Sequence, residues 1–349
     1  IFMKLSKQIK SLDRRIATLR KYSSTINKLY NHILNININH SFHSEVQKNK
    51  LSESANQSIN KLLEPTKTLR NNNDIPKIIW IFWDSGFDNA PDVVHKSVYS
   101  WRKMNPDYEI KLLSNDNLDE YLDFDFNCMF YLSSIHCLPA IKSDILRLYL
   151  LSKYGGVWAD ATTFCLQPLS FWLKEASSYC GLFTFRHKYN NTRPIEVWFI
   201  ASSKASPIIN NTLTKIVGYI FKSREYSLFI SGKLSLISNI LIGDDVPQNS
   251  QTIVNAEKLG FMPYFSTGYF FYESLKEHLS SEKLSIFLRS TNDIKMTNNH
   301  ALTKDDFDIF SHSLVSKQTY TNSYMESVLY KTRLQYLYSQ LESKSDVKC

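Results

Sequence analysis

Residues 139–162, PAIKSDILRLYLLSKYGGVWADAT, place a helix signal directly ahead of a strand signal. Apolar residues at helical spacing after an initial proline predict a helix over about 140–153. The pair Gly155 and Gly156 is typical of the end of a helix. The apolar residues that follow predict a short buried strand, which ends at Asp160. This stretch is therefore expected to form one unit of an α/β fold.

The residues that precede this stretch repeat the same alternation. An apolar run over 78–83 predicts a buried strand, Pro91 suits the first turn of a helix, and 108–113 predicts a second strand. Alternating strands and helices indicate a mostly parallel sheet with right-handed crossovers. Such sheets bind ligands beyond the carboxyl ends of their strands, where we expect Trp83 and Asp160.

Asp144 and Arg147 lie three positions apart on the predicted helix and therefore share one face. An acid and a base at this spacing are often only a solvated helical pair. The helix, however, leads through the two glycines into Asp160. We therefore expect Asp144, Arg147 and Asp160 to meet at one rim of the sheet.

The same segments resemble the sugar-binding Asp-x-Asp region of family 32 glycosyltransferases, especially the capsular polysaccharide synthesis branch. The resemblance is firm over about 75–170 and weaker near 198–201. It implies an α/β fold of the GT-A type, a nucleotide-sugar donor and retention at the anomeric carbon. The segments that carry it are 75–80, 86–91, 105–109, 140–147 and 153–162.

The resemblance also implies roles for individual residues. Asp160 is expected to be catalytic and to hold Mn²⁺ or Mg²⁺, and the remaining donor-binding candidates are Trp83, Asp144, Arg147, Gly155, Gly156 and Thr162. The chain departs from the motif in one respect, because Thr162 stands where a second carboxylate is expected. Either Asp160 holds a metal with help from elsewhere, or basic residues replace the metal, or activity is lost. We favour activity.

Three later residues complete the expected site. His312 is the candidate for a further metal ligand, with His300 as its competitor, and Lys317 is the candidate contact for the diphosphate. Glu196, just ahead of an apolar run, is a second catalytic candidate that would face the acceptor or the sugar. Its simpler interpretation is an exposed acid at a strand end.

The basic charge of the chain is concentrated at its start. Residues 1–70 hold 13 Lys and Arg and 4 Asp and Glu, a net charge of +9, whereas the whole chain carries +8. The remainder is thus almost neutral, which disfavours nucleic acid as a partner of the folded body. We predict a helical N-terminal extension over 1–70 and a glycosyltransferase domain over 71–349, with a C-terminal helix over about 321–345.

Within this extension, apolar positions over 4–33 recur at spacings of three and four and predict one basic amphipathic helix. Such a helix could lie on an anionic membrane, form a coiled coil or pack against the body. No apolar run is long enough to span a membrane, no secretory signal is recognisable, and the five cysteines lack CxxC spacing. We therefore expect a cytoplasmic protein, with peripheral contact to the inner face of the cytoplasmic membrane as one possibility.

Together these observations predict a hexosyltransferase that uses a nucleotide-sugar donor, in the first place a UDP-sugar. The expected acceptor is a capsular or other bacterial surface glycan, either an oligosaccharide or a lipid-linked glycan. Two rivals remain: a toxin or effector that glycosylates a protein, and a catalytically silent nucleotide- or glycan-binding homologue.

Overall fold

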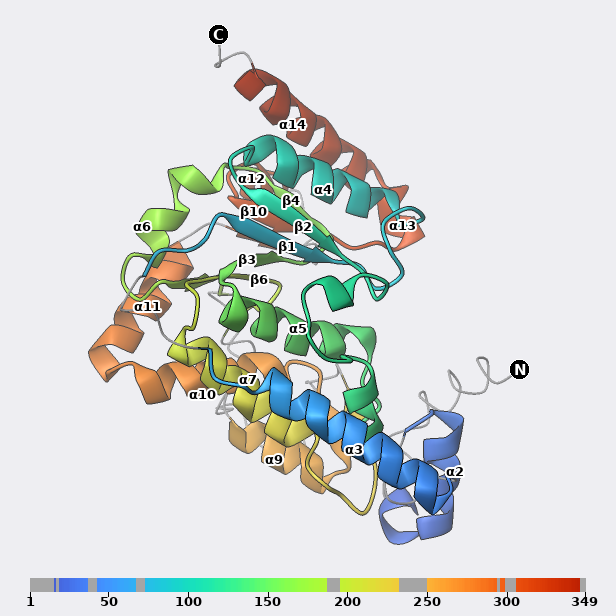
Figure 1. Ribbon diagram of the computed structural model, residues 1–349. Coiled ribbons are helices and arrows are strands. Elements are labelled where there is room, and N and C mark those ends of the chain that lie inside the picture. The colour runs from blue at the N-terminus through green and yellow to red at the C-terminus, as the bar shows by residue number, and fades with distance from the viewer. Residues whose placement is uncertain are drawn as a thin grey trace.

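The computed structural model describes residues 16, 19–36, 43–66, 73–186, 195–231, 250–293, 296–298 and 306–345. Within these ranges helices lie on both sides of a central sheet (Figure 1). The helices are α2 (Ser24–Ile33), α3 (Glu45–Leu62), α4 (Asp92–Met104), η1 (Leu118–Glu120), η2 (Cys128–Leu132), α5 (Pro139–Lys153), η3 (Leu169–Phe171), α6 (Leu173–Ser177), α7 (Pro207–Ile220), α9 (Ser250–Lys258), α10 (Ser266–His278), α11 (Ser281–Asp293), α12 (Asp306–Ser311), α13 (Asn322–Met325) and α14 (Val328–Ser345).

The central sheet has five strands in the order β2-β1-β3-β6-β5. β1 pairs in parallel with both β2 and β3, whereas β6 runs antiparallel to β3 and β5. One reversed strand in an otherwise parallel sheet confirms the predicted α/β class with a mostly parallel sheet. The strands of this sheet are β1 (Ile78–Phe82), β2 (Glu109–Leu113), β3 (Gly156–Ala159), β5 (Leu182–Thr184) and β6 (Phe199–Ser202).

Two small sheets accompany the central one. β10 (Val315–Lys317) pairs antiparallel with β4 (Thr163–Cys165) and parallel with β9 (Met296–Asn298). β7 (Phe229–Ser231) pairs in parallel with β8 (Phe261–Pro263). The pairing of β10 with β4 brings residues from near the end of the chain beside the segment that follows β3.

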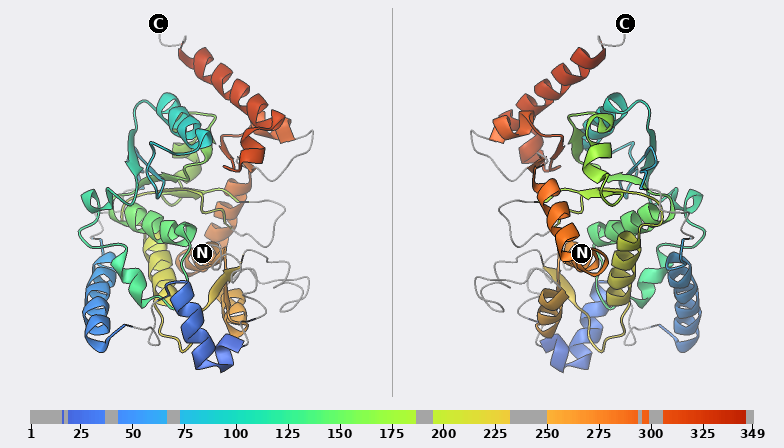
Figure 2. Two further views of the ribbon diagram at one scale, coloured as in Figure 1. Left: turned by 90° about the vertical axis from the view of Figure 1, so that its right-hand side faces the viewer. Right: turned by 90° about the vertical axis from the view of Figure 1, so that its left-hand side faces the viewer.

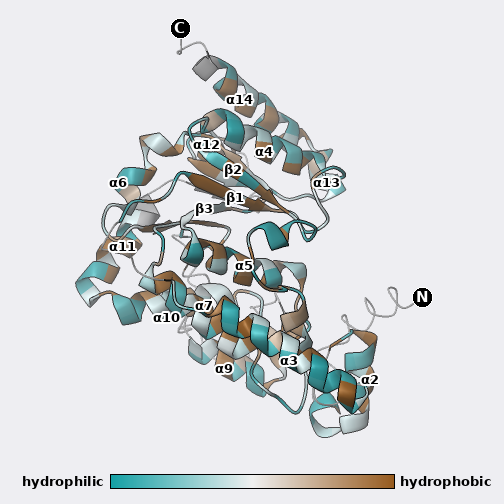
Figure 3. Ribbon diagram, in the orientation of Figure 1, coloured by the Kyte–Doolittle hydropathy of each residue, from teal (hydrophilic) through white to brown (hydrophobic). Residues whose placement is uncertain are grey.

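The core is divided by the central sheet. Alternate residues of β1 point to opposite faces: Ile79 and Ile81 belong to the cluster beneath α4 and α14, and Trp80 to the cluster beside α5 and α7. Hydrophobic colouring is dense on β1, in keeping with its burial on both sides (Figure 3). A strand buried on both faces needs a continuous apolar run, which is the pattern that residues 78–83 show.

The N-terminal helical segment differs from the single helix predicted over 4–33. Ser23 is extended, and its side chain accepts a hydrogen bond from Ile26 N, so it ends one helical stretch and caps α2. The predicted apolar seam is only partly buried: Tyr30 is 3% exposed but Leu19 is 54% exposed, whereas the polar residues Arg20 and Asn27 outside the seam are each 1% exposed. The part of the prediction over residues 1–15 lies outside the described residues.

The buried polar face of this segment contacts the body. Arg20 Nη1 donates to the carbonyl oxygen of Ser227 at 2.9 Å and to its hydroxyl at 2.8 Å. The Arg20 guanidinium also lies 3.8 Å from the centre of the Tyr30 ring. Further along, α3 packs against η2, and Leu62 at its end is 2% exposed. Packing against the body, the simplest of the three alternatives, is therefore observed for residues 19–36 and 43–66.

The C-terminal helix predicted over about 321–345 is divided in two. α13 ends at Met325 and α14 begins at Val328. α14 packs on α4, where the Tyr330 hydroxyl donates to Asp92 at 3.0 Å. α14 and α2 lie at opposite ends of the molecule (Figure 2). In the described residues no helix is both long enough and apolar enough to cross a membrane.

Candidate functional site

Asp144 and Arg147 lie on the inner face of α5, as their spacing predicted. Their residues are 7% and 3% exposed, and Arg147 Nη2 lies 3.0 Å from Asp144 Oδ1. Arg147 also donates to the carbonyl oxygen of Val197 and to the hydroxyl of Ser143. These contacts fix the guanidinium against the end of the sheet.

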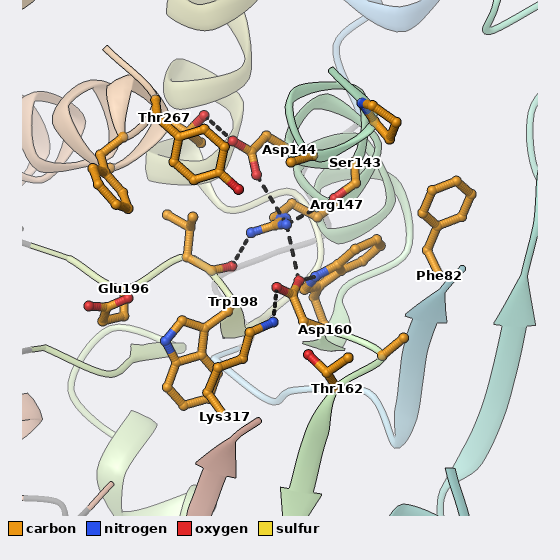
Figure 4. A pocket seen from close by; sticks show the side chains of 18 of the residues that line it. Phe82, Ser143, Asp144, Arg147, Asp160, Thr162, Glu196, Trp198, Thr267 and Lys317 are labelled. Carbon is orange, nitrogen blue, oxygen red and sulfur yellow. Dashed lines mark hydrogen bonds and ion pairs between the residues drawn. The ribbon is translucent and has the colours of Figure 1, made fainter. Parts of the chain in front are cut away.

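Asp160 follows the last residue of β3, so its side chain lies at the carboxyl edge of the parallel strands. Its Oδ1 accepts hydrogen bonds from Arg147 Nη2 at 3.1 Å and from Trp158 Nε1 at 2.9 Å. Its Oδ2 accepts from Lys317 Nζ at 2.6 Å, and Figure 4 shows the two cations on either side of the carboxylate. Burial would raise the pKa of Asp160, but Lys317 and Arg147 outweigh it and hold the pKa below its usual value.

Lys317 reaches this site because β10 pairs with β4. The register places Lys317 opposite Thr163, three residues after Asp160. The two partners are 157 positions apart in the sequence, and no motif between them indicates that they pair. The predicted diphosphate contact is therefore brought to Asp160 by strand pairing alone.

A cavity of about 620 Å³ opens in front of these residues. Because β6 runs opposite to β1 and β3, its start lies at the same edge as their ends, so all three strands contribute to the wall. Helices α5 and α10 and the segment after β10 close the other sides. The lining residues are Phe82, Trp83, Asp84, Pro139, Ala140, Ser143, Asp144, Arg147, Trp158, Asp160, Ala161, Thr162, Ile195, Glu196, Val197, Trp198, Tyr264, Phe265, Thr267, Gly268, Lys317, Gln318, Thr319 and Tyr320.

Asp144 lies in a different environment from Asp160. Burial is the main influence on it and raises its pKa, although Arg147 and the hydrogen bond from Thr267 act in the opposite direction. That bond joins Thr267 Oγ1 to Asp144 Oδ2 at 2.6 Å. The pKa values of Asp144 and Asp160, two of the four carboxyl groups of described residues that line the cavity, are thus shifted in opposite directions, a pattern that clusters at functional sites.

Two aromatic rings from distant parts of the chain form another part of the cavity wall. Trp83 follows β1 and Tyr320 follows β10, and their ring centroids are 5.4 Å apart in an edge-to-face arrangement. Tyr320 is 56% exposed. The face of an accessible aromatic ring is a flat apolar surface on which a nucleobase or a sugar ring can pack.

The structure brings most of the predicted site residues together. The cavity is lined by Trp83, Asp144, Arg147, Asp160, Thr162, Glu196 and Lys317. Glu196 is 5% exposed, so it is not the exposed strand-end acid that was its simpler interpretation. It is one of the residues that line the cavity.

Gly155 and Gly156 are not at the cavity, which corrects their expected role in binding the donor. They lie at the start of β3, the end opposite Asp160. A Cβ added to Gly156, which has φ of +99°, would lie 2.6 Å from the carbonyl oxygen of Ile78. Glycine is needed there because β3 passes close to β1 with a left-handed backbone conformation.

His312 is also not at the cavity, which corrects the predicted metal pair with Asp160. It follows α12, and its side chain is 59% exposed and lies beside Asp308. β10 separates it from Lys317, so it lies beyond the other end of that strand. Its competitor His300 lies outside the described residues.

Thr267 and Tyr320 are site residues that the sequence did not identify. Thr267 belongs to the first turn of α10, directly after the short apolar strand β8. A Ser-Thr-Gly sequence that opens a helix after a strand is the signal that could have indicated it. Tyr320 had no comparable signal other than its position three residues after Lys317.

The fold and the site together define an α/β protein that binds its ligand at the carboxyl edge of a mostly parallel sheet. The family model of the capsular polysaccharide synthesis protein matches residues 26–232, which is more than half of the 349 residues. The chain belongs to this family, as the sequence motifs predicted.

Individual relatives are more distant. The O-glycosyltransferase braB of Annulohypoxylon truncatum is 33% identical over 97 residues, 25% of this chain and 23% of that protein. The initiation-specific alpha-1,6-mannosyltransferase of Saccharomyces cerevisiae is 27% identical over 129 residues, 34% of this chain and 27% of that protein. The match thus spans about a quarter of these relatives. The solved structure of the PaToxG glycosyltransferase aligns with a TM-score of 0.31 and 20% identity, over 72% of this chain and 98% of that chain.

Proposed function

We propose that the chain is a glycosyltransferase that transfers a hexose from a nucleotide-sugar, in the first place a UDP-hexose, to a hydroxyl group of a glycan. One observation carries the proposal. The Asp160 carboxylate, held by Arg147 and Lys317, lies at the carboxyl edge of the sheet in a cavity of about 620 Å³. A cavity of this size with a few convergent polar groups is typical of small-molecule sites.

The lining residues suit the parts of such a donor. The aromatic pair Trp83 and Tyr320 offers a stacking surface for the base. Asp160 and Asp144 accept hydrogen bonds from ribose or sugar hydroxyls. Lys317 supplies a cation for the diphosphate at the same rim. Sugar transfer requires a site that binds a neutral sugar and an anionic leaving group side by side. Here carboxylates would bind the sugar, and a cation would bind the leaving group.

The transfer step itself is a substitution at the anomeric carbon. The bond from this carbon to the phosphate oxygen breaks, and the leaving diphosphate keeps the electron pair. The acceptor oxygen forms the new bond on the same face, with retention, and its proton passes to the departing phosphate oxygen. Positive charge fixed beside the diphosphate stabilises the negative charge that develops there. This route requires no strong general base from the chain.

The acceptor side of the proposal rests on Glu196 and on the family. Glu196 lies on the opposite side of the cavity from α5 in Figure 4, where an acceptor hydroxyl could meet the sugar. The description of the family supports a capsular or other surface polysaccharide, and the mannosyltransferase among the relatives supports a hexose. We therefore propose an oligosaccharide or lipid-linked glycan as acceptor.

A donor screen tests the proposal. The full chain is incubated with UDP- and GDP-hexoses, with chelator or with Mn²⁺, and the released nucleotide is measured with and without a panel of oligosaccharide and lipid-linked acceptors. We expect slow hydrolysis of one donor and faster release with a matching acceptor, and the anomeric proton coupling of the product should show retention. Transfer to proteins and not to glycans would show that the acceptor is a protein and would contradict the proposed glycan acceptor. Binding of donors without any turnover would contradict the activity.

A further inference from the structure

The Asp160 carboxylate already accepts three hydrogen bonds from groups of the protein. Oδ1 accepts from Arg147 and Trp158, and Oδ2 accepts from Lys317 at 2.6 Å. Two cations therefore flank one carboxylate. A divalent cation on Oδ2 would lie beside the Lys317 ammonium and would be repelled by it.

The other residues present do not fit a resident divalent cation either. Mg²⁺ and related hard cations are held by carboxylate oxygens, and Thr162 supplies only a hydroxyl where the family motif has its second acid. Over the ranges that the structure describes, no group of three or more His, Cys, Asp or Glu side chains is placed to hold a metal ion. The expected second ligand, His312, is exposed and lies beyond the far end of β10.

Lys317, in contrast, is placed to meet a diphosphate. Its side chain lines the cavity and is 21% exposed, so a ligand can reach the ammonium group. Asp160 takes one of the three N–H donors of that group, which leaves two for phosphate oxygens. Arg147, whose side chain is only 4% exposed, already balances the charge of Asp160 from the protein side.

We propose that the Lys317 ammonium neutralises the donor diphosphate in place of a divalent cation, so that the site binds a nucleoside diphosphate without metal. The inference rests on the proposed function and states which positive charge binds the diphosphate in that same site. Asp84 and Glu196 also line the cavity and could contact a divalent cation. The competing hypothesis is therefore that such a cation enters the site together with the donor.

Titration calorimetry on the metal-stripped full chain separates the two accounts. UDP and GDP are titrated in EDTA and again in Mn²⁺. We expect the Kd of the preferred nucleotide to change by less than about threefold between the two conditions. Binding that is lost in EDTA and restored by Mn²⁺ overturns this inference and leaves the proposed function standing. No binding under either condition overturns the proposed function, and this inference with it.

Substitutions then locate the cation. Lys317→Met keeps the length of the side chain and removes the charge, so UDP in EDTA should bind at least about tenfold more weakly, whereas Lys317→Arg should retain most of the affinity. Lys331→Met on the exposed side of α14 is the matched control and should bind as the unchanged chain does. Wild-type affinity in Lys317→Met overturns the inference, provided its melting temperature shows that it is folded.

A second variant makes the test independent of Lys317. Thr162→Asp supplies the missing carboxylate at the cavity wall. We expect UDP binding by this variant to fall at least about tenfold in EDTA and to recover with Mn²⁺, a dependence that the unchanged chain lacks. If the unchanged chain and Thr162→Asp respond to Mn²⁺ alike, with binding lost in EDTA in both, the metal is native to the site and the inference is wrong.

Discussion

Asp144, Arg147, Asp160 and Lys317 form a line of alternating charges at the edge of the sheet. Each member depends on its neighbours, because a buried charge that loses its partner is costly. Arg147 lies at the centre of the line and contacts both acids. The acids nevertheless differ: Asp160 has two cationic partners and Asp144 has one, which accounts for the opposite directions of their pKa shifts.

Asp160→Asn is the most direct test at this scale. The amide keeps the shape and an oxygen that can accept from Trp158 and Arg147, but it removes the charge. We expect donor turnover to fall at least about a hundredfold, the scale of losing one preorganised electrostatic contact. The free energy of unfolding should fall by only about 1 kcal/mol, because the side chain is 24% exposed and its ion pairs are partly screened. Unchanged turnover would place the donor site elsewhere.

The two aspartates should also have opposite signatures in the dependence of stability on pH. The pKa of Asp144 is raised from 3.8, so the folded state binds the proton more tightly and loses stability as pH rises through the interval above 3.8. The pKa of Asp160 is lowered, so its contribution is present above 3.8 and is lost as pH falls below that value.

Denaturant unfolding between pH 3 and pH 7 measures this difference. As pH rises above 3.8, the stability of wild type relative to Asp144→Asn should fall, because the amide does not ionise. Below 3.8, the stability of wild type relative to Asp160→Asn should fall as pH decreases. Curves for Asp144→Asn and wild type that remain parallel above pH 3.8 would contradict the assigned shift.

At the scale of elements, the alternation of strands and helices over 78–160 could be predicted because local signals and burial agree there. The boundaries of α5 and β3 follow from a proline, a glycine pair and apolar runs that the tertiary structure does not override. The glycine pair shows the limit of this reasoning. The sequence shows that two glycines stand here. It does not show whether a ligand or a neighbouring strand requires them, because that depends on the position of β1.

Gly156→Ala tests this assignment. The added Cβ would meet the Ile78 carbonyl at 2.6 Å in a left-handed backbone conformation, so we expect a loss of about 2–5 kcal/mol in the free energy of unfolding. Gly86→Ala is the matched control, since Gly86 has φ of +79° but nothing within 4 Å of an added Cβ. It should cost only about 1–2 kcal/mol. Equal costs would show that conformation alone, and not contact with β1, requires Gly156.

The N-terminal segment was harder to predict for a related reason. Its spacing of apolar residues indicated a buried seam, yet Leu19 of that seam is exposed and the polar residues Arg20 and Asn27 are buried. Their burial depends on contacts with residues 225–227, about two hundred positions away. A local sequence pattern cannot indicate partners so far away. The contacts of Lys317 with Asp160 and of Thr267 with Asp144 could not be predicted for the same reason.

At the scale of the whole molecule, the N-terminal segment combines a basic sequence with exposed apolar side chains among its described residues. Residues 1–70 carry 13 Lys and Arg against 4 Asp and Glu, and Leu19, Tyr22 and Leu29 are 54%, 80% and 57% exposed. We propose that this end rests on an anionic membrane surface, where each basic residue contributes about 1 kcal/mol. A position beside a membrane would suit a lipid-linked acceptor.

Co-sedimentation with vesicles tests this proposal. The chain should bind vesicles that contain phosphatidylserine and not vesicles of phosphatidylcholine alone, and Leu29→Asp should weaken the binding several-fold. Val328→Asp, at an 80% exposed position on α14 at the other end of the molecule, is the control and should have no effect. Equal binding to neutral vesicles would contradict the proposal. So would self-association in sedimentation equilibrium that Leu29→Asp abolishes.

The distance in sequence between Asp160 and Lys317 has a consequence for biosynthesis. A ribosome delivers the central strands, α5 and Asp160 well before β10, so a nascent chain can form most of the sheet while its carboxylate has only Arg147 as a cationic partner. The site is completed when the last strand pairs with β4. A chain that ended between α10 and β10 would therefore keep the central sheet and most of the cavity wall but would lack Lys317 and Tyr320.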